Sequence, residues 1–113
     1  MKFKLIKNTK HQNNDIHFSK NGQLRFKSQF VLDFDIKKGD LIAIGIDEDE
    51  KEPKSIYLVK SEKEAFKVQD GSGQFFIQAK GAMDNLNFHG GTKFTYERFE
   101  IDNYRGMKLT IKP

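Results

Sequence analysis

Residues 21–40 read NGQLRFKSQFVLDFDIKKGD, and residues 72–91, 51 positions later, read SGQFFIQAKGAMDNLNFHGG. Aligned without a gap, the two stretches share four identities in twenty, namely Gly22/Gly73, Gln23/Gln74, Asp33/Asp84 and Gly39/Gly90. Both have the order turn, short strand, short helix and glycine turn. We therefore predict two copies of one small β-rich unit, the alternative being chance similarity between short β-rich segments with glycine turns.

The first copy opens with a strand. Asn21-Gly22 is a turn signal, and the alternation that follows places Leu24 and Phe26 on one face and Arg25 and Lys27 on the other. Such alternation is typical of a half-buried strand. The pattern predicts that the two cations project away from the core.

A short amphipathic helix follows the strand. Ser28 is a good helix N-cap, because its hydroxyl accepts a hydrogen bond from a free backbone N–H. Phe30, Val31 and Phe34 then form one apolar stripe. We expect the helix to end near Asp35.

The remaining chain reads as strands joined by polar turns. The patterns predict strands at residues 1–6, 16–19, 41–46, 55–60, 66–68, 74–78, 93–101 and 107–112, and a weak helix at 79–86. Residues 47–54, DEDEKEPK, read as an exposed hairpin loop. A strand–helix–hairpin unit of this size cannot bury its own apolar face, whereas two units in one chain or across a dimer can close a barrel.

The length of 113 residues indicates a single compact domain. We divide it into an N-terminal strand and polar linker (1–15), a first repeat (16–60), a connector (61–71) and a second, divergent repeat (72–113). No apolar run is long enough for a membrane span, the first residues do not read as a signal peptide, and the sequence contains no cysteine. We expect a cytoplasmic protein.

The first repeat resembles the AbrB/SpoVT family. The resemblance lies in the order of its parts: NGQLRF, a short helix, DIKKGD, a strand, an acidic loop and IYLVK. The resemblance covers residues 16–60 well and residues 72–111 weakly. It implies a mostly β fold with short helices, a swapped-hairpin AbrB-like barrel in which two strand–helix–hairpin repeats form a pseudo-dimer. That family contains bacterial transition-state regulators and antitoxins.

Two features depart from the family pattern. Members usually carry an arginine directly after the first glycine and a proline before the helix, where this chain has Gln23 and Lys27. In the second copy, Gln74, Phe76 and Gln78 replace much of the basic face. The resemblance therefore implies the fold more strongly than the function.

The charge is unevenly distributed. The net charge is +4 overall, but residues 1–38 carry +6 and the rest carry −2. A basic third is compatible with a polyanionic partner, although a lysine-rich soluble surface explains it as well. The predicted contacts to duplex DNA phosphates are Lys20, Arg25, Lys27, Lys37 and Lys38. The alternative is that Lys37 and Lys38 cap the helix and Arg25 makes a cross-strand salt bridge.

Enzymatic chemistry is not indicated. His11, His17 and His89 are the only histidines, and their spacing does not match a metal motif. The acidic run at 47–50 lacks the glycine and ligand spacing of a calcium loop. We expect no cofactor, no catalytic residue and no metal.

Two further sets of residues are candidates for contact with a partner. Phe76, Phe94, Tyr96 and Phe99 are candidates for base stacking, although we expect most phenylalanines to be buried. Phe99, Ile101 and Tyr104 form a protein interface or belong to the core. The predicted function is a non-enzymatic DNA-binding module and transcriptional regulator, monomeric as a pseudo-dimer or homodimeric. The alternative is a structural or protein-interaction domain, antitoxin-like or a scaffold, without DNA binding.

Overall fold

The computed structural model describes residues 2–4, 16–71 and 73–112. Within these ranges the elements are β1 (Ile16–Phe18), β2 (Gln23–Phe26), α1 (Ser28–Asp33), β3 (Leu41–Gly45), β4 (Ser55–Lys60), β5 (Ala65–Lys67), β6 (Gln69–Gly71), β7 (Gln74–Gln78), α2 (Lys80–Asn85), β8 (Lys93–Ile101) and β9 (Tyr104–Ile111). The described part of the predicted N-terminal strand, residues 2–4, is not a strand. The rest of that prediction lies outside the described residues.

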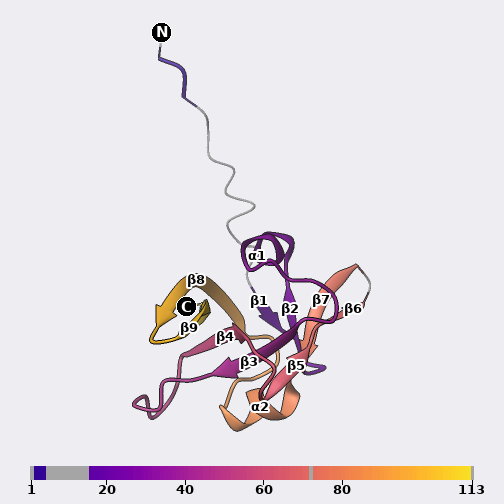
Figure 1. Cartoon of the computed structure of the whole chain (residues 1–113), viewed down its shortest axis with the longest axis vertical. Coiled ribbons are helices and arrows are strands. Elements are labelled where there is room, and N and C mark those ends of the chain that lie inside the picture. The colour runs from indigo at the N-terminus through magenta and orange to yellow at the C-terminus, as the bar shows by residue number, and fades with distance from the viewer. Residues whose placement is uncertain (1, 5–15, 72, 113) are drawn as a thin grey trace.

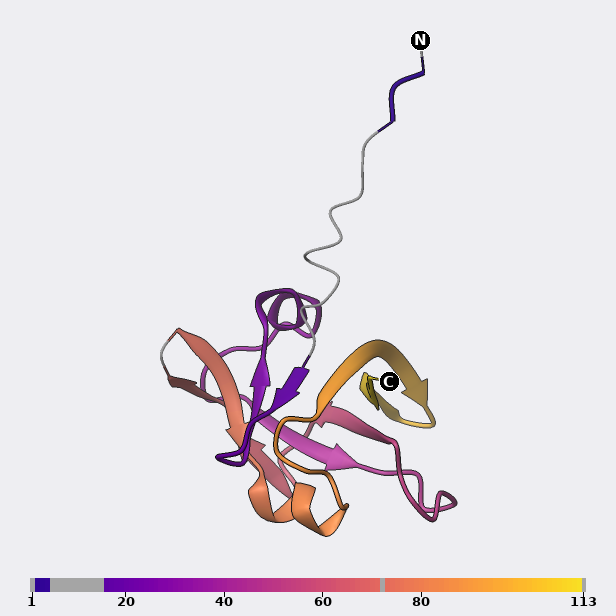
Figure 2. The same ribbon diagram turned by 180° about the vertical axis from the view of Figure 1, so that it is seen from behind.

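The strands form one antiparallel sheet in the order β5-β3-β4-β9-β8-β1-β2-β7-β6 (Figures 1 and 2). The strands at its two ends, β5 and β6, belong to the single stretch 65–71. β5 pairs with β3 and β6 pairs with β7. Between them, Val68 donates its N–H to the Asp40 carbonyl and accepts from the Gly39 N–H. This stretch therefore connects the two ends of the sheet, which curls into a nearly closed barrel.

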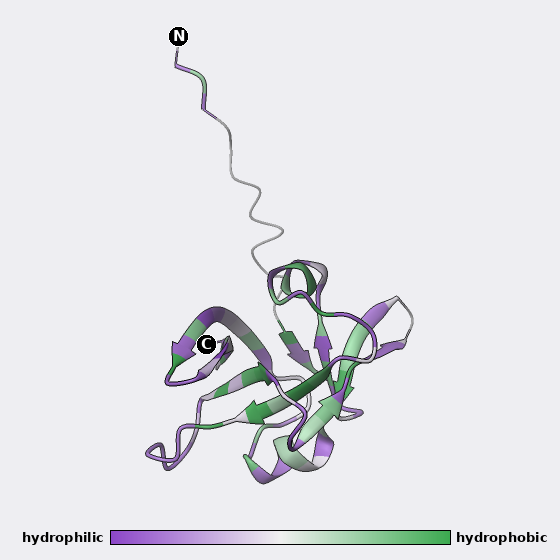
Figure 3. Cartoon of the chain, viewed as in Figure 1, coloured by the Kyte–Doolittle hydropathy of each residue, from purple (hydrophilic) through white to green (hydrophobic). Residues whose placement is uncertain are grey.

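The inward face of the barrel is apolar. The largest fully buried side chains are Phe18, Phe26, Phe30, Phe94, Ile16, Leu24, Ile42, Ile56, Leu58, Ile77, Met83 and Met107. Figure 3 shows hydrophobic colour concentrated on the strands and hydrophilic colour on the connection between β3 and β4. The predicted inward direction of Leu24 and Phe26 is confirmed, and so is the exposed acidic loop at 47–50.

Helix α1 differs from the prediction at both ends. Ser28 is its first helical residue, and the N-cap is Lys27, whose side chain makes no capping bond. The helix ends at Asp33 because Asp35 adopts the left-handed conformation (φ 52°). The N–H of Ile36 then donates to the Val31 carbonyl. Ile36 is buried, which closes the helix with an apolar C-terminal contact.

Helix α2 ends in the same way. Asn87 is left-handed (φ 63°), and the N–H of Phe88 donates to the Met83 carbonyl at 3.0 Å. Phe88 and Met83 are both buried. Among the described residues, no helix is long and apolar enough to cross a membrane.

Candidate nucleic-acid interface

Three basic side chains lie side by side across strands β8, β1 and β2. Lys93 is the register partner of His17, and His17 is the partner of Arg25. Their neighbours Ile16, Phe18 and the β2 residues on either side of Arg25 are buried. Because side chains alternate between the faces of a sheet, these three project outward together. We call Lys93, His17 and Arg25 the basic row.

Lys27 extends this surface. It follows Arg25 by two residues in extended backbone (φ −84°, ψ 165°), so it projects from the same face. The pKa of His17 is lowered by partial burial and then by the positive charges of Lys93, Lys27 and Arg25. A depressed pKa leaves His17 mainly neutral near pH 7, surrounded by three permanent cations.

Arg25 is held in place by two neutral glutamines. Its Nε and Nη2 donate to Gln23 Oε1 at 3.0 and 2.7 Å, and its Nη1 donates to Gln74 Oε1 at 3.2 Å. The alternative of a cross-strand salt bridge is wrong for the described residues, whose ion pairs join Lys60 to Asp40, Lys80 to Asp84 and Arg105 to Glu100. Among the described residues, the guanidinium is thus oriented by neutral groups and is not paired with a carboxylate.

Lys20 lies at the far end of the β1–β2 hairpin from Lys27. It is exposed in the turn, where the Ser19 carbonyl accepts from the Gly22 N–H. The Lys20 backbone packs closely against Gly90. A Cβ added to Gly90 would lie 2.7 Å from the Lys20 Cα. Lys20 is therefore on the same hairpin as Arg25 but not in the basic row.

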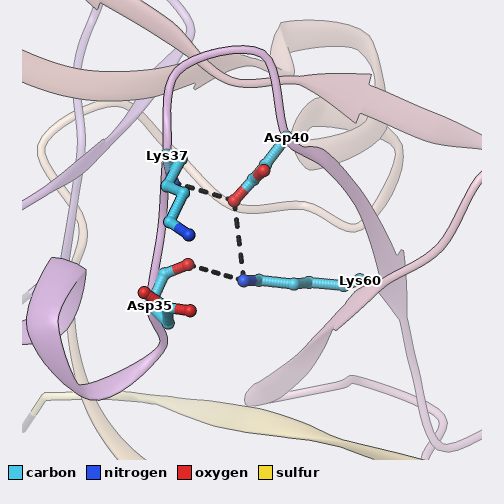
Figure 4. A network of polar contacts seen from close by, with 4 residues as sticks. All are labelled: Asp35, Lys37, Asp40 and Lys60. Carbon is cyan, nitrogen blue, oxygen red and sulfur yellow. Dashed lines mark hydrogen bonds and ion pairs between the residues drawn. The ribbon is translucent and has the colours of Figure 1, made fainter.

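Lys37 and Lys38 occupy the exposed loop between α1 and β3. Asp40 Oδ2 accepts from the Lys37 N–H at 2.8 Å and lies 3.5 Å from Lys60 Nζ. Lys60 Nζ also donates to the Asp35 carbonyl at 2.6 Å, as Figure 4 shows. This network fixes the loop.

The two loop lysines are separated from the basic row, although they follow the end of α1 by only a few residues. The loop bonds to Val68, so β6 and β7 separate it from Arg25. The last turn of α1 itself holds no basic residue, and the alternative that the two loop lysines cap this helix end stays a prediction. The structure thus brings together Arg25 and Lys27 of the five predicted residues, and adds His17 and Lys93.

Sequence reasoning missed His17 and Lys93 because they join the cluster through strand pairing. The alternation in β8 predicts that Lys93 faces outward. Its neighbour across the sheet depends on β8 pairing with β1, a contact between residues more than 70 positions apart. No local pattern indicates that register.

The base-stacking candidates are mostly inaccessible. Phe94 is fully buried and Phe76 is 9% exposed, so stacking on a base is wrong for both. Tyr96 packs edge-on against Phe30 and donates its hydroxyl to Asp33 at 2.8 Å. Phe99 is half-buried against the Tyr57 ring. These aromatic rings serve packing.

A hollow of about 660 Å³ lies beside the end of α1. Its charged side chains contact one another or nearby backbone: Arg98 donates to the Asp33 carbonyl at 2.7 Å, and Arg105 lies 3.7 Å from Glu100. Because these opposite charges pair with one another, the hollow carries no strong charge of one sign. The hollow therefore attracts an anionic ligand less strongly than the basic row does.

The histidines do not gather into a metal site. His89 is exposed in a turn, as expected, and His11 lies outside the described residues. No group of three or more His, Asp or Glu side chains suited to a metal occurs in the part of the chain that the structure describes. Comparisons with protein-family models, curated proteins and solved structures give no significant match.

Proposed function

We propose that the protein is a small non-enzymatic DNA-binding module that contacts the phosphates of duplex DNA through Arg25, Lys27 and Lys93. The observation that carries this proposal is the oriented Arg25, which shares one outward face with two lysines and has no carboxylate paired to it among the described residues. Oriented cations release condensed counterions when they neutralise phosphates, which drives association.

The geometry of Arg25 suits an oxyanion partner such as a phosphate group. Arg25 is fixed by its bonds to Gln23 and Gln74, while its charge remains available. A planar guanidinium recognises phosphate oxygens in a fixed direction, and the lysines add mobile point charges beside it. Transcriptional regulation is the biological role that fits such a module, on the model of the AbrB/SpoVT resemblance.

The finer fold proposed for the chain is a swapped-hairpin barrel. In support, the β8–β9 hairpin of the second half lies between β4 and β1 of the first half. Arg25 lies opposite Phe76 in the β2–β7 pair, and Tyr57 lies opposite Lys108 in the β4–β9 pair. Each pair is separated by 51 residues, the spacing of the sequence repeat. A pseudo-two-fold axis would place equivalent residues opposite one another in this way.

The backbone conformation adds a second argument for duplication. Left-handed residues recur in both halves at spacings of 51 or 52, as the pairs Gly22/Gly73, Asp35/Asn87 and Gly39/Gly91. The last two pairs are spaced by 52, as are the first residues of the two helices, Ser28 and Lys80. The Gly39/Gly91 pair therefore replaces the Gly39/Gly90 alignment, and the one-residue shift falls between the strand and the helix. Because few residues adopt this conformation, its repetition in the same order supports one ancestral unit.

The test is fluorescence anisotropy of a labelled mixed-sequence duplex with the full chain at low salt. We expect Arg25→Glu to abolish measurable binding while circular dichroism and the melting temperature stay close to wild type. The matched control is Lys51→Glu, the same charge change in the exposed β3–β4 loop. Equal binding by wild type and a folded Arg25→Glu variant would remove Arg25 from the site.

A protein-interaction domain without DNA binding is the second candidate. One observation favours it: the large apolar side chains of Ile101 and Tyr104, at the tip of the β8–β9 hairpin, are exposed. Absence of duplex binding at low salt by the wild-type chain would favour this candidate.

A further inference from the structure

An apolar groove lies where the β3–β4 hairpin meets the tip of the β8–β9 hairpin. Its volume is about 620 Å³, and its apolar lining includes Ile46, Tyr57, Phe99, Ile101 and Tyr104. We call it the hairpin groove. Ile46, Ile101 and Tyr104 are 42, 52 and 62% exposed. Large apolar side chains gathered on an outer surface are typical of an interaction site.

The rim of the hairpin groove is acidic. Asp47, Glu48 and Glu64 line it, against a single cation, Lys63. The β3–β4 loop continues with further carboxylates, all exposed. A segment that fits this groove therefore combines an apolar side chain for the floor with cations for the rim.

The chain carries such a segment at its own N-terminus. Phe3 is 81% exposed, the most exposed of the large hydrophobic residues in the described part. Lys2 and Lys4 flank it and are exposed as well. In an extended segment neighbouring side chains point in opposite directions, so Phe3 can face a groove floor while both ammonium groups remain at its rim.

We propose that Phe3 of a second copy of this chain docks in the hairpin groove, with Lys2 and Lys4 facing Asp47 and Glu48. Residues 2–4 lie away from the barrel of their own chain (Figures 1 and 2). Two copies that exchange these segments reciprocally form a closed pair with two equal contacts. The second contact is then intramolecular, which strengthens an otherwise small interface.

This inference goes beyond the proposed function and does not rest on it. The groove uses β3, β4, β9 and the distal end of β8, whereas the basic row uses β1, β2 and the first residue of β8. A loss of DNA binding in Arg25→Glu leaves the groove intact. Substitutions in the groove likewise leave Arg25 and Lys27 unchanged.

The experiment is sedimentation velocity of the full chain over a wide concentration range, for wild type, Phe3→Asp and Tyr104→Asp. We expect wild type to dimerise. The dissociation constant of each variant rises roughly tenfold or more, because the reciprocal pair loses the burial of a large apolar side chain at both of its contacts. The control is Leu32→Asp, which changes a residue 74% exposed on α1 outside the groove. It leaves the association unchanged.

Mixing the two variants separates docking from misfolding. Phe3→Asp retains a wild-type groove and Tyr104→Asp retains a wild-type segment, so an equimolar mixture recovers association through one intact contact. Should Tyr104→Asp fail to fold, Glu48→Lys serves as the groove variant. A wild-type chain that stays monomeric, or a mixture that does not associate, would overturn the proposal. So would an equal effect of Leu32→Asp.

Discussion

Arg25 is the residue on which the proposed DNA contact depends. A strand arginine on an open surface samples many rotamers, and ordering it on binding costs conformational entropy. Here two glutamine oxygens already hold the guanidinium, Gln23 from the same strand and Gln74 from the neighbouring strand. Gln23 stands where the AbrB/SpoVT pattern usually has arginine. At that position the chain has a neutral partner for Arg25 instead of a further cation.

Gln23→Glu tests whether Arg25 must be held by a neutral side chain to bind DNA. A carboxylate 2.7 Å from Nη2 would hold Arg25 as firmly but would neutralise its charge. We expect duplex affinity to fall about tenfold, equivalent to about 1.4 kcal/mol, with unchanged or slightly higher stability. Anisotropy titration measures the affinity and urea unfolding the stability. Asn103→Asp, the same change of an exposed amide to a carboxylate in the β8–β9 turn, is the control. Undiminished affinity in Gln23→Glu would contradict the role assigned to Arg25.

His17 predicts how binding and stability depend on pH. Burial, Lys93, Lys27 and Arg25 lower its pKa in the folded chain below the ordinary value near 6.5. The folded state thus binds this proton less readily than the unfolded state. The contribution of His17 to stability is present above pH 6.5 and is lost as pH falls towards the folded pKa.

Low pH weakens the fold through His17, but it strengthens phosphate binding, because a protonated His17 adds a cation to the basic row. We expect duplex affinity to rise severalfold as pH falls below about 6.5. His17→Gln removes this component, whereas His89→Gln, in an exposed turn, keeps it. Anisotropy titrations across pH 5.5 to 7.5 measure the difference, the range being about one pH unit either side of the ordinary pKa. An identical pH dependence in both variants would exclude His17 from the interface.

At the scale of the elements, local sequence patterns predict which segments form strands and helices. They predict the first and last residues of those segments less accurately. The bounds of β4, β7 and β8 match the alternation in the sequence. β9 begins at Tyr104, three residues before the predicted start, because the polar residues YRG continue the hairpin opposite β8. Their pairing is imposed by the partner strand, not by their own propensities. The helices end early for a similar reason, since left-handed Asp35 and Asn87 turn an apolar residue into the core.

Two glycine substitutions give opposite results at this scale. At Gly106 in β9, an added Cβ would collide with the Leu58 carbonyl oxygen of β4. We expect Gly106→Ala to destabilise the fold by about 1–3 kcal/mol. At Gly81 in α2 nothing lies within 4 Å, so Gly81→Ala stabilises the fold, by up to about 1 kcal/mol, through helix propensity. Urea unfolding compares the two. A neutral Gly106→Ala would show that β4 and β9 pair less closely than described.

At the scale of the whole molecule, the two halves are interleaved. The pairs β4–β9, β8–β1 and β2–β7 each join one half to the other. Periodicity predicts the individual strands, and the repeat suggests that they form a shared barrel. The order of strands around the barrel is not readable from local pattern, because it depends on contacts between distant residues. The same limit explains why Arg25 and Lys27 were predictable site residues while Lys93 and His17 were not.

The salt dependence of duplex binding tests the proposed DNA contact most directly. A labelled mixed-sequence duplex is titrated with the full chain at several potassium chloride concentrations, and the logarithm of the affinity is plotted against that of the salt. Contacts from Arg25, Lys27 and Lys93 to three phosphates predict a slope of about −2.7, at roughly 0.9 per phosphate. A chain that does not bind at the lowest salt, or that binds with a slope near zero, would contradict the account and direct attention to the hairpin groove.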